Sequence, residues 1–359
     1  MEFTTYTLGE VCSRLSSGKS IKAAEIFPAG KYPVYGGNGL RGYADRSNFE
    51  GECAIIGRQG AYCGNVRYFK GEAYMTEHAV VCQANEKANT YYLSALLSTM
   101  HLERLSGQSA QPGLAVGTLS VQEINLPSLE AQRSIASILS SLDRKIELNN
   151  KINADLEEMA QAIFKNWFVD FEPFKDGKFV DSELGMIPEG WEVGTLEDLI
   201  TIKYGKDHKK LEDGTFPVYG SGGLMRFVNS WLYDGESVLI PRKGTLDNIM
   251  YVCEKFWTVD TMFFSAPKMD YVMKYVYNYI KRFDFSKMNE GTSVPSNTAA
   301  RLNKMQILIP THEVLEMYDE TLCPIYNKRK MNDKESRTLS TLRDTLLPRL
   351  MSGELEIPE

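Results

Sequence analysis

Phosphate binding is the first chemistry that this sequence suggests, because Ser17-Gly18-Lys19-Ser20 ends like a nucleotide-binding P-loop. A P-loop also needs a glycine five residues before its Gly-Lys pair, and Ser13 stands at that position. The Gly36-Gly37-Asn38-Gly39 loop lacks dinucleotide-binding spacing and fits better a turn in which glycines take positive φ angles. The histidines, at positions 78, 101, 208 and 312, show no metal-ligand spacing. We therefore expect no catalytic residue, no metal site and no cofactor in this chain.

A second set of polar side chains suits the recognition of nucleic acid. Arg, Lys, Asn and Gln can hydrogen-bond to base edges, while Lys, Ser and Thr bind phosphates. In the first half of the chain the candidates stand in predicted loops: Lys19, Lys22, Asn38, Arg41, Arg58, Gln59, Gln108, Ser109 and Gln111. In the second half they are Lys206, His208, Lys209, Lys210, Ser221, Arg226, Arg242, Lys243, Ser293, Ser296, Asn297 and Arg301. For each of them, the alternative is an ordinary solvated loop residue.

The elements that must position these loops occur twice. Residues 32–40 return as 216–224 and residues 51–60 return as 235–244, each at an offset of 184. This period is far too long for a solenoid, so it indicates a duplicated domain. Short β-rich runs between Gly, Asn and Ser loops predict two mixed α/β modules, at 1–128 and 191–310. Two like modules suit a target with two halves, and duplex DNA is the obvious candidate.

The repeated framework carries different polar residues in its loops. Gln59 becomes Lys243, and Gln108-Ser109-Ala110-Gln111 becomes Gly291-Thr292-Ser293-Val294. Arg58 and Arg242 are retained, which favours a phosphate or structural contact over base discrimination. Divergent loop chemistry on a common scaffold is what two readers of different DNA sequences need.

A long helix is predicted after each module, at 129–170 and 311–352, with a linker at 171–190. A heptad numbered from Ile135 puts apolar residues at most a and d positions, and an offset of 183 repeats it in the second helix. Position a includes Asn149 and Asn332, and a buried Asn at this position fixes register. We expect an α+β fold with two globular modules separated by an antiparallel coiled coil, pseudo-two-fold symmetric. The alternative is two amphipathic helices that each lie on their own module.

Charge and cysteine content narrow the class of protein. The net charge is −7, but the two modules are nearly neutral and the acidity lies in the helical segments. This distribution predicts modest affinity for DNA of arbitrary sequence. The six cysteines form no CxxC pair and read as reduced thiols of a cytoplasmic protein. We expect no signal peptide and no membrane span, because no apolar run approaches 18 residues.

Four strings carry a resemblance to a known family: residues 126–135, 164–173, 184–191 and 346–355. Together, and in this order, they closely resemble the specificity (S) subunit of type I restriction-modification systems, over essentially the whole chain. Residues 107–114 also resemble the Gly-Ser-x-Gln-Pro-x-Leu element that closes a target recognition domain, a match that is weaker in the second copy.

The resemblance implies that this chain is a non-catalytic DNA-binding adaptor. Each target recognition domain would read one part of a split DNA sequence, and the helices would set the spacer. It implies assembly with two methylation (M) subunits and with restriction (R) subunits, which would hold S-adenosylmethionine, ATP and Mg²⁺. Candidates for the contact with M subunits are Trp167, Phe168, Phe171 and Phe174. The alternative for these aromatic residues is packing of the helix end onto the second module. The alternative for the whole chain is a coiled-coil scaffold whose two modules bind protein or carbohydrate.

Overall fold

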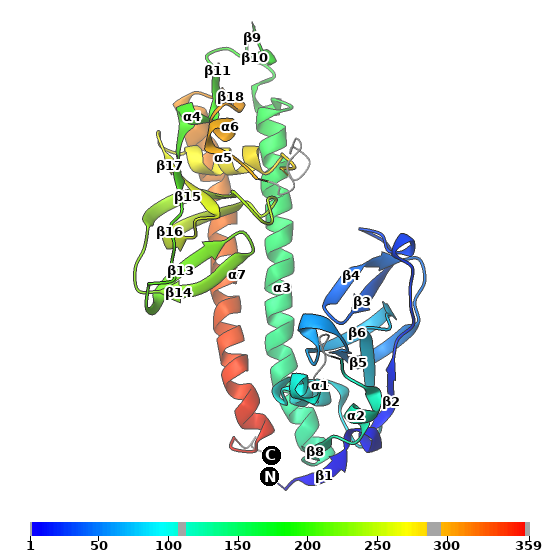
Figure 1. Cartoon of the computed structure of the whole chain (residues 1–359). Helices are drawn as coiled ribbons and strands as arrows, with labels where there is room; N and C mark the ends of the chain where they lie inside the picture. The colour runs from blue at the N-terminus through cyan, green and yellow to red at the C-terminus, as the bar shows by residue number, and fades with distance from the viewer. Residues whose placement is uncertain (1, 107–112, 286–295, 356–359) are drawn as a thin grey trace. The chain divides into compact units, whose positions relative to one another are not determined.

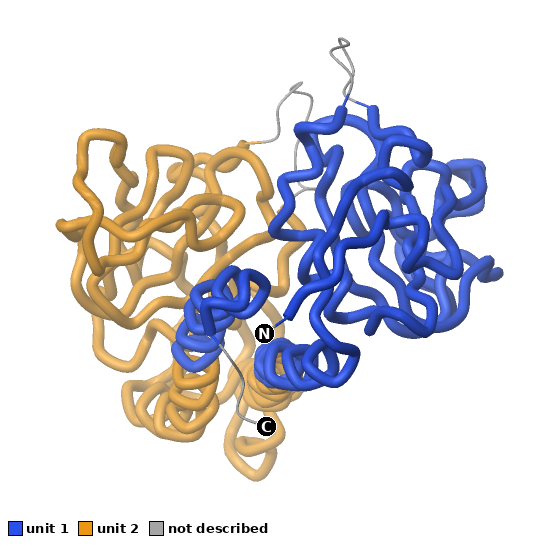
Figure 2. Tube along the Cα trace, turned by 90° about the horizontal axis from the view of Figure 1, so that it is seen from below, with its two compact units in different colours: residues 1–149, 333–359 blue, residues 150–332 orange. Residues whose placement is uncertain are grey.

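The computed structural model of the chain describes residues 2–106, 113–285 and 296–355 (Figure 1). The chain divides into two compact units, coloured separately in Figure 2. Unit 1 contains residues 1–149 and 333–359, and unit 2 contains residues 150–332. Four of the candidate contacts lie outside the described residues: Gln108, Ser109, Gln111 and Ser293.

Unit 1 is built on a six-stranded sheet with the strand order β2-β7-β5-β6-β3-β4. Its strands are β2 (Cys12–Ser17), β3 (Tyr32–Gly36), β4 (Gly39–Ala44), β5 (Phe49–Gly57), β6 (Val66–Met75) and β7 (Ala79–Ala84). Neighbouring strands are antiparallel, except that β3 runs parallel to β6. A separate pair is formed by β1 (Thr4–Thr7) and β8 (Glu123–Leu126), and the helices are α1 (Thr90–Thr99) and α2 (Val116–Ser120).

The central strand β5 explains how this sheet is buried. Its residues 53–57 are all buried, as expected for a strand that is covered on both faces. Ala54 and Ile56 face the core that contains α1, while Cys53 and Ile55 face a second, smaller core. The helix α1 begins after Asn89, whose side-chain oxygen accepts a hydrogen bond from the backbone N–H of Tyr92.

Unit 2 repeats this architecture with the order β12-β17-β15-β16-β13-β14. Its strands are β12 (Ile200–Tyr204), β13 (Asp213–Gly220), β14 (Gly223–Val228), β15 (Tyr233–Pro241), β16 (Met250–Thr258) and β17 (Met262–Pro267). Two short antiparallel pairs accompany the sheet: β9 (Phe179–Ser182) with β10 (Gly185–Pro188), and β11 (Glu192–Thr195) with β18 (Gln306–Ile309). The short helices are α4 (Leu196–Leu199), α5 (Val272–Ile280) and α6 (Ala299–Asn303).

The duplication predicted from the sequence is confirmed down to local irregularities. The register of the β3–β4 pair shifts between Val34 and Tyr35, and the β13–β14 register shifts at the matching step from Val218 to Tyr219. Each unit also contains the same capped turn, in which a threonine backbone N–H and hydroxyl both donate to one carboxylate. The pairs are Thr7 with Glu10 and Thr195 with Asp198.

The chain contains two long helices of 40 residues each, α3 (Leu129–Phe168) and α7 (His312–Met351). Each unit contains one half of each helix, and within each unit the halves pack antiparallel. In unit 1, Asp143 pairs with Arg343 at 2.7 Å and Lys145 pairs with Glu335 at 3.1 Å. In unit 2, contacts join Asn153 to Asn332 and Glu157 to Arg329. None of the helices in the described ranges combines the length and the apolar character that a membrane span needs.

The packing seam confirms the predicted a positions and corrects the predicted d positions. Asn149 and Asn332 are buried, at 0% and 1% exposure. Most predicted d side chains instead point to solvent: Ile138, Met159, Thr321, Lys328, Glu335 and Leu342 are exposed. The second position of the seam lies one residue later in each repeat: Leu139, Ile146, Asn153 and Ala160 in α3, and Leu322, Arg329, Ser336, Arg343 and Leu350 in α7.

The seven-residue period of the sequence does not by itself fix the second position of the seam. After each a position the next seam residue can follow at a distance of three or of four, and both patterns repeat every seven residues. The sequence offers apolar residues at both places, Ile138 and Leu139. Only Leu139 reaches the core that α1 forms with the sheet. Packing against the module therefore selects the seam.

Candidate DNA interface

At one end of the unit 1 sheet, loops distant in sequence are joined by backbone hydrogen bonds. We call these segments the rim of unit 1: residues 17–19, 36–39, 57–59, 76–78 and 113–114. The N–H of Arg58 donates to the carbonyl of His78, and the N–H of Leu114 donates to the carbonyl of Arg58, both at 2.9 Å. The N–H of Thr76 donates to Tyr35 at 2.9 Å. Because backbone groups carry these contacts, the side chains of the rim remain available for other partners.

Glycine is required where these segments cross most closely. A Cβ on Gly18 would lie 2.1 Å from the carbonyl oxygen of Met75, and a Cβ on Gly57 would lie 2.7 Å from the carbonyl oxygen of Gly37. Both distances are too short for any side chain. The Ser17–Ser20 string therefore serves a close crossing of backbones and not a phosphate loop of the P-loop type.

Unit 2 has the same rim, formed by residues 204–206, 220–223, 241–244, 258–261 and 296–297. The N–H of Arg242 donates to Thr261 at 2.8 Å, and the N–H of Asn297 donates to Arg242 at 3.0 Å. A Cβ on Gly205 would lie 2.0 Å from the carbonyl oxygen of Val259. The duplicated sequence thus builds the same backbone support twice.

The two retained arginines lie at matching places in the rims. The Arg58 guanidinium donates to the hydroxyl of Ser17 at 3.3 Å, and the Arg242 guanidinium donates to the carbonyl of Asp260 at 3.4 Å. Arg242 also stacks over Tyr204, with 5.5 Å between the guanidinium carbon and the ring centroid. A guanidinium has five N–H donors, so each arginine keeps most of its donors for a phosphate or a base.

Around these arginines the rims expose different side chains. Lys19, Asn38 and Gln59 are exposed in unit 1, and Lys206 and Lys243 are exposed in unit 2. Ser221 and Ser296 are half-buried at the unit 2 rim. The carbonyl of Ser221 accepts a hydrogen bond from the Asn248 amide at 2.9 Å, and Ser296 pairs with Lys243 through a β-bridge. The structure therefore gathers these candidates, although they are distant in sequence.

The prediction of Asn297 as a DNA contact is wrong. Its side chain is 2% exposed and donates to the carbonyl of Pro241 at 2.9 Å. Its backbone takes the place that Leu114 has in unit 1, where the side chain is also buried. The prediction rested on a polar residue in a loop, and the residue type does not show that this position faces the core.

Arg226 does not occupy in unit 2 the place that Arg41 has in unit 1. Strand pairing matches Val34 with Gly42 and Val218 with Arg226, so the counterpart of Arg41 is Met225. Arg41 and Met225 indeed lie beneath the equivalent glycines, Gly36 and Gly220. The Arg226 guanidinium faces the loop before β13, where it donates to the carbonyl of Leu211.

Other candidates lie away from the backbone contacts that define the rims. Lys22 begins a short turn, where its N–H donates to the Glu25 carboxylate at 3.2 Å. His208, Lys209 and Lys210 belong to the loop that precedes β13. Arg301 is half-buried on α6.

Two residues that contact the rims were not predicted from the sequence. The Arg67 guanidinium carbon lies 3.1 Å from where a Cβ on Gly39 would stand, and Asn248 donates to Ser221. Arg67 stands inside β6 and Asn248 in an unpatterned loop, so neither position carries a motif signal.

The aromatic residues proposed for contact with M subunits pack inside unit 2 instead. Phe168 is 5% exposed and lies 4.6 Å from Tyr275 and 4.8 Å from Tyr318, between ring centroids. Trp167, Phe171 and Phe174 are half-buried against the same core. The prediction is wrong for Phe168, because its surface is already buried. The packing alternative describes this cluster.

The site has donors for DNA and no grouping typical of metal catalysis among its described residues. Within the described ranges, no three His, Cys, Asp or Glu side chains are grouped as metal ligands would be. What each rim offers is a set of amide, guanidinium and ammonium donors on a backbone-supported edge. The fold and the rims thus define a class: a duplicated binding protein in which each of two like modules presents one loop surface.

Comparisons with known proteins identify the family. Residues 1–158 and 188–332 match the type I restriction modification DNA specificity domain. The chain is 31% identical over 298 residues to the specificity subunit of the type I restriction enzyme MjaIX of Methanocaldococcus jannaschii, covering 75% of this chain and 69% of that protein. It is 43% identical over 141 residues to the specificity subunit of the Escherichia coli enzyme EcoprrI, covering 38% and 35% of the two chains.

The fold has a solved counterpart as well. The S subunit of a type I restriction-modification system from M. genitalium superposes with a TM-score of 0.63 at 20% identity, covering 98% of this chain and 96% of that chain. The chain belongs to the family of type I restriction-modification specificity subunits. Its function is therefore DNA recognition, and as a specificity subunit it is not a catalytic component.

Proposed function

We propose that this chain reads a bipartite DNA target, with one half-site for the rim of each unit. The observation that carries the proposal is the contrast between the rims. Exposed Gln59 in unit 1 corresponds to exposed Lys243 in unit 2, and Arg41 corresponds to Met225. Glutamine suits the adenine edge, while lysine suits guanine. The two rims therefore favour different base sequences on the same backbone support.

Arg58 and Arg242 hold the DNA backbone in this proposal. They are retained between the rims and anchored by weak internal hydrogen bonds, at 3.3 Å and 3.4 Å. Phosphate contacts position a protein on the duplex without reading its sequence, which suits residues that do not vary between the two readers.

The long helices set the spacer between the half-sites. Each has 40 residues and contributes one half to each unit. A continuous α-helix rises about 1.5 Å per residue, so its length measures distance. The buried Asn149 and Asn332 favour a single register of the pair, which a ruler requires.

The helices also offer a surface to partner subunits. Their exposed apolar side chains are Ile138, Leu148 and Met159 on α3, and Met317, Met331 and Leu342 on α7. Exposed apolar side chains of this kind can pack against a partner protein. We infer that two methylation subunits dock there, and that restriction subunits join them. S-adenosylmethionine, ATP and Mg²⁺ would be bound by those partners.

Sequencing of the methylated sites in cells that carry the complete system tests the proposal. The wild-type system should yield two half-sites and a spacer of constant length. Gln59→Lys should change the half-site of unit 1 alone, and Lys243→Gln should change that of unit 2 alone. Gln122→Lys adds the same charge at a position before β8, outside the rim, and should change neither. If Gln59→Lys alters both half-sites or neither, the assignment of one rim to one half-site is wrong.

The ruler is tested by lengthening both helices together. Seven residues inserted after Asn149 and seven after Asn332 preserve the seven-residue seam. They add about 10.5 Å of helix, which corresponds to about three base pairs. Both half-sites should persist while the spacer grows by that amount. An unchanged spacer would contradict the ruler.

A further inference from the structure

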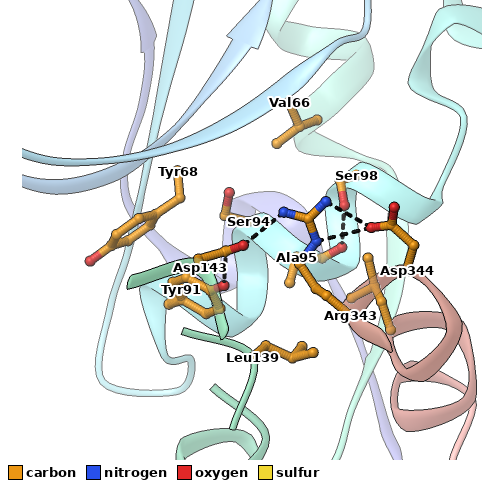
Figure 3. A pocket seen from close by; sticks show the side chains of 11 residues that line it. Val66, Tyr68, Tyr91, Ser94, Ala95, Ser98, Leu139, Asp143, Arg343 and Asp344 are labelled. Atoms are coloured by element: carbon orange, nitrogen blue, oxygen red, sulfur yellow. Dashed lines mark hydrogen bonds and ion pairs between the residues drawn. The ribbon is translucent and has the colours of Figure 1, made fainter. Parts of the chain in front are cut away.

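Unit 1 contains a pocket where strand β6, helix α1 and the two long helices meet (Figure 3). Its volume is about 290 Å³. Tyr68, Ser94 and Leu139 line it, together with Asp143 of α3 and Arg343 of α7. DNA reading at the rim does not use this pocket, because the pocket lies between the sheet and the long helices.

The duplication shows what fills the equivalent space in unit 2. The modules correspond at an offset of 183 in this region. Tyr68 pairs with Ala54 as Tyr251 pairs with Val238, the equivalent residue of the repeat. Buried Tyr92, Leu93 and Leu97 of α1 likewise match buried Tyr275, Val276 and Ile280 of α5. The counterparts of the pocket residues are then Tyr277 for Ser94, Asn278 for Ala95, Tyr326 for Asp143, Ala160 for Arg343 and Tyr251 for Tyr68.

In unit 2 these tyrosines form a packed cluster. Tyr277 and Tyr326 are 2% and 6% exposed, and their ring centroids lie 6.0 Å apart. Tyr251 packs edge-on against Tyr326 at 4.7 Å. The phenol of Tyr277 donates to Glu157 at 2.9 Å, and that of Tyr326 accepts from the Asn278 amide at 3.0 Å. Two phenol rings with satisfied hydroxyls thus stand in unit 2 where unit 1 has Ser94 and Asp143.

The polar groups of the unit 1 pocket are only partly satisfied. Ser94 is 4% exposed, and its hydroxyl, which Figure 3 shows at the pocket, has no hydrogen-bond partner among the described residues. The nearby hydroxyl of Ser98, in contrast, donates to the carbonyl of Ala95 at 2.7 Å. Asp143 accepts from Tyr91 and from Arg343. The Ser94 hydroxyl, with one O–H donor and two acceptor lone pairs, is therefore available to a ligand in the pocket.

We propose that this pocket binds one phenol ring, supplied by a tyrosine side chain of a methylation subunit. The filled site of unit 2 defines the chemistry, because phenol rings occupy the equivalent position there. The size agrees: a cavity of about 150 Å³ already accepts benzene, and this pocket has about 290 Å³. Tyr68 and Tyr91, whose centroids lie 4.9 Å apart, provide an aromatic wall. The incoming hydroxyl would bond to Ser94.

A partner is the source because the pocket adjoins the helices that the proposed function assigns to docking. Arg343 and Asp344 of α7 line it, and the exposed Leu342 is adjacent in sequence. This inference rests on that proposed docking. It adds that the two units receive their methylation subunits differently, since only unit 1 leaves the pocket to be filled from outside.

The first experiment uses p-cresol, the side-chain analogue of tyrosine, with the full-length chain. Titration followed by NMR should show saturable binding to one site at about millimolar concentration. Toluene, which lacks the hydroxyl, should bind at least threefold more weakly. Ser94→Tyr fills the pocket as in unit 2 and should weaken p-cresol binding at least tenfold. Ser137→Tyr, on the exposed face of α3, is the matched control and should leave binding unchanged.

A second variant creates a new binding site, so the test does not depend on whether Ser94→Tyr folds. Tyr277→Ser opens the equivalent space in unit 2 and should raise the number of p-cresol sites from one to two. Absence of saturable binding by the wild-type chain overturns the proposal. So does binding that Ser94→Tyr leaves intact, because the ring would then bind elsewhere.

The source of the ring is tested by assembly with the cognate methylation subunit. Ser94→Tyr should weaken the first binding event at least tenfold, whereas Ser47→Tyr, at an exposed position between β4 and β5 and outside the long helices, should match wild type. If p-cresol binds but Ser94→Tyr assembles normally, the pocket takes free phenols only and the proposal of a partner side chain is overturned. If even the wild-type chain binds no methylation subunit, the proposed docking itself is wrong, and the p-cresol result stands apart from it.

Discussion

Substitution of Gly18 by alanine should weaken unit 1 and with it one half of DNA recognition. An alanine Cβ would lie 2.1 Å from the carbonyl oxygen of Met75, which is 0.9 Å below the 3.0 Å that real Cβ atoms keep. The obstacle is backbone, so no side-chain rotation relieves it. The end of β2 must move away from the turn between β6 and β7.

The magnitude follows from the hydrogen bonds that this movement breaks. The N–H of Gly18 donates to Ala79 and the N–H of Lys19 donates to Met75, each at 3.0 Å. Each such bond contributes about 0.5–1.5 kcal/mol. We therefore expect a loss of about 2 kcal/mol in the free energy of unfolding of unit 1. Gly205→Ala should have the same effect in unit 2, where the distance is 2.0 Å.

Gly117→Ala is the matched control. It adds the same methyl group within α2, where nothing lies within 4 Å of the new Cβ. Alanine in a helix is about 0.5–1 kcal/mol more favourable than glycine, so this variant should be slightly more stable than wild type.

Urea denaturation followed by hydrogen exchange of peptides from β2 and β12 separates the two units. Gly18→Ala should increase exchange in β2 and leave β12 unchanged, and the assembled complex should lose affinity only for targets that depend on the first half-site. If Gly18→Ala and Gly117→Ala have unfolding midpoints that agree within error, the reasoning about the backbone crossing is refuted.

Three further predictions concern charge. Arg58→Ala should lower DNA affinity about equally for all sequences and reduce the slope of log affinity against log salt by about one. An unchanged slope would show that Arg58 contacts no phosphate. Hydrogen bonds from the backbone and hydroxyl of Thr7 lower the pKa of Glu10 below its ordinary 4.5. The stabilisation from the Glu10 carboxylate should therefore be present above pH 4.5 and be lost as the pH falls through the lower folded-state pKa. Thermal unfolding measured across this pH range should show the loss for wild type and not for Glu10→Gln. Lys274 is 4% exposed and pairs with Asp319 at 2.7 Å and Glu236 at 3.2 Å. Lys274→Ala should cost about 3–5 kcal/mol by leaving these carboxylates without their partner, and a cost below 1 kcal/mol in urea unfolding would show that they relax into water.

The repeat and the long helices could be predicted from the sequence because both are periodic. An offset of 184 aligns the glycine framework, and the seven-residue pattern marks both helices. The seam within the pattern could not be predicted, since Ile138 and Leu139 are both apolar. The choice between them depends on which one reaches the core of unit 1, and that core is built from strands far away in the chain.

The sequence predicted which loops form the candidate site, but not which residues of those loops are exposed. Lys19, Arg58 and Gln59 meet at one rim because backbone hydrogen bonds join their loops. Residue type could not reveal that Asn297 faces the core, as Leu114 does in the other unit. Arg67 was missed because strand residues carry no loop signal, although its guanidinium lies against the β3–β4 turn.

By itself, the sequence determined the family, the duplication and the two helices, because these depend on local strings and on periods that repeat along the chain. The tertiary structure alone decided which side chain faces the core, which loop lies against which, and where space is left. Burial and cavity volume depend on contacts between residues distant in sequence. The same fold therefore fills one helix-side pocket with Tyr277 and Tyr326 and leaves its counterpart open at Ser94.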